Sequence, residues 1–195
     1  ILSDEIYSNL TFEEKHKSIS NFYPEGTIVS TGLSKWCGAG GWRLGFFALP
    51  NELEELKNSL KILCSESFTS VSAPIQHAAV EAYTGDYSEY LGGVKKILSS
   101  VGMHAYENLK SNVINVSKPE GGFYLFPEFV NAKFSTSSEM CKEILNKTGV
   151  ALLPGSDFGL DKKKMIARLS YTDFDGENFL KNTTGSKNLD TDDLK

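Results

Sequence analysis

The sequence predicts an α/β protein whose two parts are built differently. Short β-branched or aromatic runs alternate with segments of helical apolar spacing in the first part, a pattern typical of layered sheet and helices. Short strand-like runs surround one helix in the second part, which indicates a small α+β unit. A long helical pattern at about 87–110 joins the two parts. We therefore expect a domain with its connecting helix over residues 1–105, a small domain over 106–182 and a polar tail over 183–195.

The first part is expected to hold strands at residues 1–3, 27–31 and 42–49, the first ending in a turn at Ser3-Asp4. The segment 52–65 places leucines on one face of a helix and charged residues between them. A second helix is expected over 73–85, because Pro74 suits a first helical turn and Gly85 suits a helix end. The connecting helix contains Gly92, Gly93 and Gly102, which lower its helix propensity.

The second part begins with a hairpin signal. Residues 113–116 and 123–126 are strand-like, and a Pro-Glu-Gly-Gly turn at 119–122 separates them. Further elements are expected as a helix at 137–147, strands at 149–153 and 165–171, and a short helix at 175–182. We expect these elements to form one compact α+β domain.

Composition narrows the class of protein. The chain has 195 residues, of which 40% are hydrophobic and 23% charged, values typical of soluble globular proteins. Its net charge of -5 disfavours a nucleic-acid or anionic-membrane partner, and no apolar run or leader indicates a membrane span or a signal peptide. Three cysteines without a CxxC spacing indicate free thiols in a reducing, cytoplasmic compartment. The histidines lack metal-ligand spacing, so no metal site is expected.

A few polar residues stand out as candidates for chemistry: Asp4, Tyr7, Lys35, Arg43 and Arg168. Each also has an ordinary structural interpretation. Asp4 can cap a helix, Tyr7 can pack against its neighbours, and Lys35 and Arg43 can be solvated surface charges. Arg168 can pair with Asp173 at a strand end. What favours a functional interpretation is that the set matches one small molecule group by group.

That molecule is pyridoxal phosphate. Its aldehyde needs an amine, which Lys35 can supply as a Schiff base. Its ring nitrogen needs an anion such as Asp4, and its 3'-oxygen needs a donor such as Tyr7. Its phosphate needs a cation such as Arg43, next to glycines that let the backbone approach.

Several motifs carry a family resemblance. They are SDEIYSNLTF, TGLSKWCGAGGWRLG, EGGFYLFPEF, GVALLPGSDFG and ARLSYTDFDG. In this order they resemble the C-terminal half of a class I/II pyridoxal-phosphate aminotransferase, the aspartate aminotransferase family of fold type I, over about residues 1–182. The resemblance implies a partial fold type I: the remainder of the large-domain sheet followed by the small C-terminal domain. It also implies the roles given above for Asp4, Tyr7, Lys35 and Arg43, and it implies that Arg168 binds the α-carboxylate of the substrate.

The motifs depart from the family at one position. Many members have a serine three residues before the lysine, where it reaches the phosphate, and this chain has Gly32 there. Ser34 or Ser30 can partly compensate, so Ser34 is a candidate phosphate ligand. The family's N-terminal half, with its phosphate-binding helix, is also missing from the matched region. The chain has no initiator Met and opens on what resembles a strand end, so we expect a fragment, and we expect the isolated chain to be inactive.

The function implied by the resemblance is amino transfer between an amino acid and a 2-oxo acid, in a homodimer that uses pyridoxal 5'-phosphate. Two alternatives stay open. The same scaffold can host a β-eliminating carbon-sulfur lyase, because a fold does not determine its reaction. The chain can also be a non-catalytic fragment that only folds or associates, since unpaired sheet edges favour association.

Overall fold

The computed structural model describes residues 1–183 of the chain. These residues fall into two compact units, one over Ile1–Leu91 and one that begins at Gly92. The division lies inside the helix α3 (Ser88–Leu109), which the sequence predicts as the connector. The domain boundary at 105/106 stays a prediction. Of the predicted tail over 183–195, Thr183 ends the helix α5, and the rest lies outside the described residues. Within the described residues, no helix is long and apolar enough to cross a membrane.

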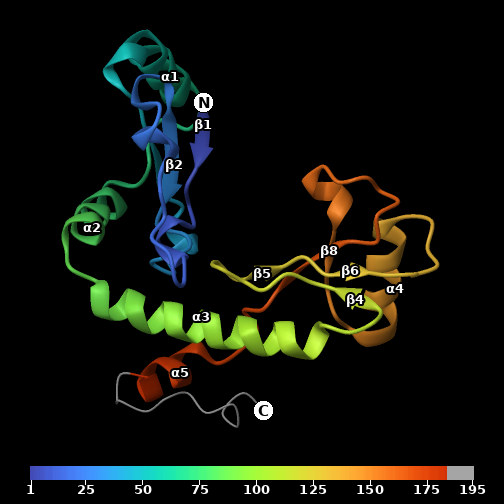
Figure 1. The fold of residues 1–195 in the computed structure, drawn as a ribbon. Coiled ribbons are helices and arrows are strands. Elements are labelled where there is room, and N and C mark those ends of the chain that lie inside the picture. The colour runs from blue at the N-terminus through green and yellow to red at the C-terminus, as the bar shows by residue number, and fades with distance from the viewer. Residues whose placement is uncertain (184–195) are drawn as a thin grey trace. The chain divides into compact units, whose positions relative to one another are not determined.

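The first unit contains a three-stranded sheet in the order β1-β2-β3. Its strands are β1 (Leu2–Asp4), β2 (Ile28–Gly32) and β3 (Gly45–Ala48). The β1 strand runs parallel to β2, with Asp4 opposite Ser30, and β3 runs antiparallel to β2, with Gly32 opposite Gly45. The β1 and β2 strands lie side by side in Figure 1, and the pairing places their carboxyl ends next to the amino end of β3 at one edge of the sheet.

All three strands are predicted, but β3 begins later than expected. The segment Gly40–Trp42 forms a 3-10 turn, and Arg43 follows it in the left-handed conformation, with φ 54. This backbone conformation is incompatible with a strand, so the extended run starts only at Gly45. Other 3-10 turns of the unit lie at Ser8–Leu10, Ile19–Asn21, Pro24–Gly26 and Asn51–Leu53.

The structure confirms the helices that the apolar spacing predicts in the first unit. They are α1 (Glu54–Ser67) and α2 (Ala73–Thr84), and α3 begins at Ser88. The leucine face that predicts α1 is present, but the described residues cover it only in part: Leu53 and Leu60 are half-buried, whereas Leu56 and Leu63 are exposed by 41% and 60%. The apolar spacing thus predicts the helix correctly. Whether the leucine face of that helix is buried depends on what packs against it.

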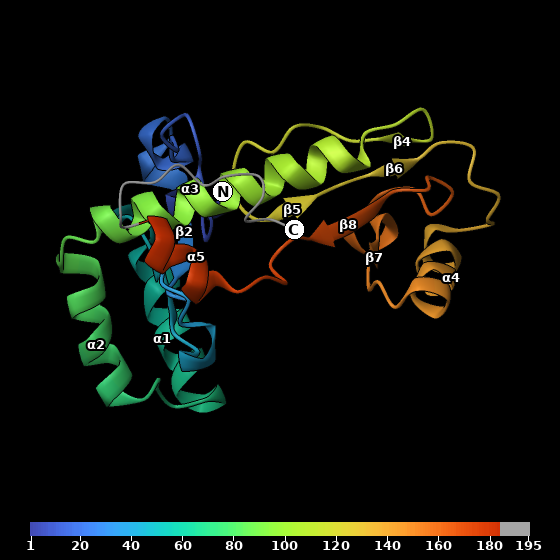
Figure 2. The ribbon, with the colours of Figure 1, turned by 90° about the horizontal axis from the view of Figure 1, so that it is seen from below.

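The second unit contains two small sheets. Its strands are β4 (Ile114–Asn115), β5 (Tyr124–Leu125), β6 (Glu128–Phe129), β7 (Leu153–Pro154) and β8 (Ala167–Ser170). The β4 strand pairs with β6, while β5, β8 and β7 form a separate antiparallel sheet in that order. The helix α4 (Ser137–Thr148) lies beside β7 (Figure 2), and α5 (Gly176–Thr183) ends the described chain.

The predicted hairpin between residues 113–116 and 123–126 is wrong. Both strands exist, but β4 pairs with β6 and β5 pairs with β8. Pro127, which lacks a backbone N–H, separates the aromatic run into β5 and β6, and each piece takes a different partner. The carbonyl of Pro127 instead accepts a hydrogen bond from the Ala167 amide at 3.1 Å.

The predicted strand at 149–153 is also too long. Gly149 ends α4 in the left-handed conformation, with φ 76, and only Leu153–Pro154 pairs with β8. The core of the unit forms between α4 and β8, from Met140, Cys141, Met165 and Ala167. Cys141 is buried there as a free thiol, and Cys37 and Cys64 are free as well, as the sequence predicts.

Close packing against Tyr171 explains why α3 has a glycine at position 102. Tyr171 is buried, its hydroxyl donates to the carbonyl of Gly122 at 3.1 Å, and burial raises its pKa to about 12. A Cβ atom on Gly102 would lie 2.8 Å from that hydroxyl oxygen. The glycine that lowers helix propensity therefore makes room for the tyrosine after β8.

Candidate functional site

The end of β1 carries the first pair of candidate residues. Asp4 is exposed at the last position of the strand, and its Oδ1 accepts a hydrogen bond from the Ile6 amide at 3.3 Å. Asp4 therefore caps a turn here. Tyr7 is half-buried just before the Ser8–Leu10 turn, which the buried Leu10 anchors. The strand end thus presents a carboxylate and a phenol from one short segment.

Lys35 lies in the turn that follows β2. Its Nζ lies 5.8 Å from the centroid of the Tyr7 ring, so the fold brings these two candidates together. Leu33 and Trp36, with exposed fractions of 0% and 5%, flank the lysine and anchor the turn. The indole of Trp36 packs against Tyr83 of α2, with 5.8 Å between ring centroids. Because its neighbours are buried, the lysine-bearing turn is held against the sheet.

Arg43 lies at the same sheet edge from the other direction, just before β3 begins. Its side chain is exposed, and Nη1 donates to the Gly40 carbonyl at 3.0 Å. A non-glycine residue with φ 54 is in a sparsely populated conformation that costs about 1–2 kcal/mol. Strain of this kind is typical of functional sites, where the surrounding structure holds a side chain in place.

Gly32 has a structural reason to be glycine. A Cβ atom there would lie 2.7 Å from the Leu44 carbonyl oxygen and 3.0 Å from the Gly45 Cα. The serine that many family members have at this position does not fit unless β3 moves. Ser30, opposite Asp4 in the sheet, and Ser34, in the lysine turn, stay the candidates for that role.

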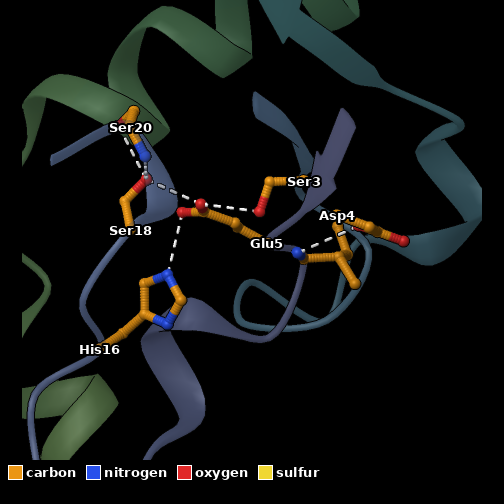
Figure 3. A network of polar contacts seen from close by, with 7 residues as sticks. Ser3, Asp4, Glu5, His16, Ser18 and Ser20 are labelled. Atoms are coloured by element: carbon orange, nitrogen blue, oxygen red, sulfur yellow. Dashed lines mark hydrogen bonds and ion pairs between the residues drawn. The ribbon is translucent and has the colours of Figure 1, made fainter. Parts of the chain in front are cut away.

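Sequence reasoning missed Glu5, which lies between Asp4 and Tyr7. Its carboxylate is 8% exposed and collects polar partners from two segments (Figure 3). Ser18 and Ser3 donate their hydroxyls to Oε1 at 2.7 and 3.1 Å, and His16 Nε2 lies 2.9 Å from Oε2. The only sequence signal is an acidic residue at a strand end, which does not reveal its distant partners.

These contacts determine whether the Glu5 carboxyl is ionised. Burial raises the pKa of the carboxyl, but hydrogen bonds from Ser18, His16 and Ser3 and the charge of His16 outweigh it and hold the pKa below its usual range. The buried carboxylate is therefore ionised at neutral pH. A carboxylate can only accept, so His16 Nε2 carries the hydrogen in this contact.

Arg168 belongs to the second unit, in β8. Its guanidinium carbon lies 4.3 Å from the Tyr124 ring centroid and 4.4 Å from that of Phe158. Among residues 1–183, no ion pair joins Arg168 to Asp173, so the structural alternative for this arginine is not supported. Aromatic contacts occupy the faces of the guanidinium and leave the N–H groups at its edge to recognise a carboxylate.

The chemistry of the first unit's donor set fits pyridoxal phosphate. An exposed carboxylate, a phenol next to an ammonium and an exposed guanidinium lie at one sheet edge. Edges where strands end are where open α/β sheets bind ligands. The set offers an anion for the ring nitrogen, a donor for the ring oxygen, an amine for the aldehyde and a cation for the phosphate.

Comparisons with known proteins agree with this chemistry. The family model described as "Aminotransferase class I and II" matches residues 1–180. A Bacillus subtilis protein named "Probable N-acetyl-LL-diaminopimelate aminotransferase" is 38% identical, with 81% of this chain and 39% of the relative covered. The aspartate aminotransferase of the same organism is 34% identical, with 88% and 44% covered. The chain thus spans less than half the length of these relatives.

A solved structure shows the same likeness in three dimensions. The alanine aminotransferase from Pyrococcus furiosus matches with a TM-score of 0.78 and 31% identity, over 87% of this chain and 44% of that protein. The described fold is therefore part of the fold that this aminotransferase has.

Proposed function

Because this chain belongs to the class I and II aminotransferases, we propose that the protein transfers an amino group between an amino acid and a 2-oxo acid with pyridoxal 5'-phosphate. The observation that carries the proposal is the position of the Lys35 ammonium beside the Tyr7 ring, at the sheet edge where Asp4 ends β1. The chain spans about 44% of the aspartate aminotransferase it matches, so the activity is proposed for the whole protein.

Pyridoxal phosphate, when bound, supplies an aldehyde for the amine and a ring that stores the electrons released from the substrate Cα. With the coenzyme bound, Lys35 Nζ would take the proton from that carbon as general base and deliver it, as general acid, to the carbon that was the coenzyme's aldehyde. Asp4 would hold the ring nitrogen and keep it protonated, since an opposite charge favours the charged form. The Tyr7 hydroxyl donates to the 3'-oxygen of the ring.

Binding and orientation fall to the remaining residues. Arg43 and Ser34 bind the phosphate, the arginine with its planar set of donors. Arg168 binds the α-carboxylate of the substrate, and its position between the Tyr124 and Phe158 rings orients the guanidinium before the substrate arrives.

The proposal extends to assembly and location. We propose a homodimer, because β1 and β3 are edge strands of the described three-stranded sheet and their unpaired edges favour association.

Free cysteines at positions 37, 64 and 141 support a cytoplasmic location. Amino acids and 2-oxo acids are the proposed partners, and nucleic acid and membrane are not expected.

The decisive experiment separates amino transfer from elimination. The protein as its gene encodes it is mixed with pyridoxal phosphate, and the absorbance of the bound coenzyme is recorded before and after an amino acid is added. We expect a 2-oxo acid in an amount equal to the coenzyme that becomes aminated. Release of ammonia and a thiol from a cysteine conjugate, without this exchange, would instead identify a carbon-sulfur lyase, and the absence of any band would identify a non-catalytic protein.

Arg168→Lys is expected to raise KM for the amino acid about 10- to 100-fold and to change kcat less, because a lysine keeps the charge but loses the planar pair of donors. Steady-state kinetics over a range of amino acid concentrations measures the effect. Lys163→Gln, which removes an exposed charge from the same unit, is the control. An unchanged KM in Arg168→Lys would remove Arg168 from the substrate site.

A further inference from the structure

Glu5 separates the two residues assigned to the coenzyme ring, Asp4 and Tyr7. We propose that Glu5 is a positioning residue: its buried carboxylate clamps the segment 16–18 onto the end of β1 and thereby sets the positions of Asp4 and Tyr7. The coenzyme part of this inference rests on the proposed function, whereas the clamp itself does not.

The side chain of Glu5 is bound on both oxygens. Oε1 accepts from Ser18 and Ser3, and Oε2 faces His16 Nε2 at 2.9 Å (Figure 3). Ser18 is itself held by Ser20, whose amide donates to the Ser18 Oγ at 3.1 Å. The carboxylate therefore ties a segment eleven to thirteen positions later in the chain to the strand end.

The backbone of Glu5 is bound on both sides too. Its amide donates to the Ser30 carbonyl at 2.8 Å, which extends the β1–β2 pairing beyond Asp4. Its carbonyl accepts from the Ser8 amide at 3.0 Å, which closes the turn that contains Tyr7. A rotation of Glu5 would therefore move Asp4 on one side and Tyr7 on the other.

A direct role in the reaction is not supported for Glu5. Its carboxylate is 8% exposed, and its hydrogen bonds come from hydroxyls and an imidazole of the protein. Asp4, the neighbour in the strand, is exposed and is therefore accessible to a ligand. Burial of a charge whose hydrogen bonds come from protein groups on another segment is explained when the charge holds these groups in place.

The test compares Glu5→Gln with Glu14→Gln in the protein as its gene encodes it. The control makes the same chemical change at an exposed residue of the following loop. Amide hydrogen exchange is measured without coenzyme, and the affinity for pyridoxal phosphate and the pH midpoint of its bound absorbance are measured with it. In Glu5→Gln, but not in Glu14→Gln, we expect Ser8 and Leu10 to exchange about tenfold faster and the coenzyme to bind about tenfold more weakly. We also expect the pH midpoint to shift, because the ring partners have moved.

The outcomes separate the two proposals. Unchanged exchange at Ser8 and Leu10 would overturn the clamp. Faster exchange with an unchanged affinity and pH midpoint would overturn the positioning role, because a purely structural contact does not reach the ring. If the wild-type protein binds no pyridoxal phosphate, the proposed function and the positioning of ring partners both fail. The hydrogen-exchange data still show whether Glu5 holds segment 16–18 against the end of β1. Ser18→Ala, which removes a single donor, is the second variant if Glu5→Gln does not fold, and the same outcomes apply to it.

Discussion

Replacement of Lys35 by alanine is expected to lower the rate of amino transfer at least about 1,000-fold. Alanine has neither the amine that bonds to the aldehyde nor the base that takes the proton from the substrate Cα. The same change is expected to abolish the absorbance that a covalently bound coenzyme gives. Single-turnover kinetics and an absorbance spectrum of the purified variant measure the two effects.

The matched control is Lys61→Ala, which removes an exposed lysine from α1 in the same unit. We expect this variant to keep both the absorbance and the rate. If Lys35→Ala retains turnover at a normal rate, Lys35 loses its proposed role, and the assignment of the sheet edge as the coenzyme site loses its main support.

Gly32→Ala is expected to lower the free energy of unfolding by about 2–3 kcal/mol. The added methyl group would lie 2.7 Å from the Leu44 carbonyl oxygen, and the backbone of β3 cannot move away without loss of its pairing with β2. Alanine restricts the unfolded chain, which stabilises by about 0.4–1 kcal/mol, less than the clash costs. Urea unfolding followed by circular dichroism measures the difference.

Gly41→Ala provides the comparison, because a Cβ atom on Gly41 has nothing within 4 Å. We expect this variant to unfold at the same urea concentration as the wild type, or slightly higher. Equal destabilisation by the two changes would show that close packing of β2 against β3 is not the reason for a glycine at position 32. Gly32→Ala is also expected to weaken coenzyme binding, since Arg43 lies two residues before the start of β3.

The helices were predictable because their signal is local. The apolar spacing of 52–65, Pro74 at the start of α2 and Gly85 at its end depend on neighbours within a turn or two. The strand pairing of the second unit was not predictable in the same way. The β5 strand could pair with the nearer β4 or with the distant β8, and local composition does not distinguish these partners.

The residues of the candidate site also differ in how far the sequence alone reveals them. Asp4, Tyr7, Lys35 and Arg43 stand out in short motifs, so their identity is visible without a structure, although their roles stay predictions. Glu5 has no motif of its own, and its partners His16 and Ser18 reach it only through the fold. Its burial, and hence the need for those partners, is a property of tertiary structure.

By itself, the sequence determined the α/β class, the helices and the residue types that a pyridoxal phosphate site requires, because these depend on local order and spacing. Only the tertiary structure decided that the Lys35 ammonium lies beside the Tyr7 ring, that Gly32 and Gly102 make room for β3 and Tyr171, and that Glu5 is clamped by His16 and Ser18. The physical reason is that each of these contacts joins segments far apart in the chain, and such contacts form only when the strands and helices pack.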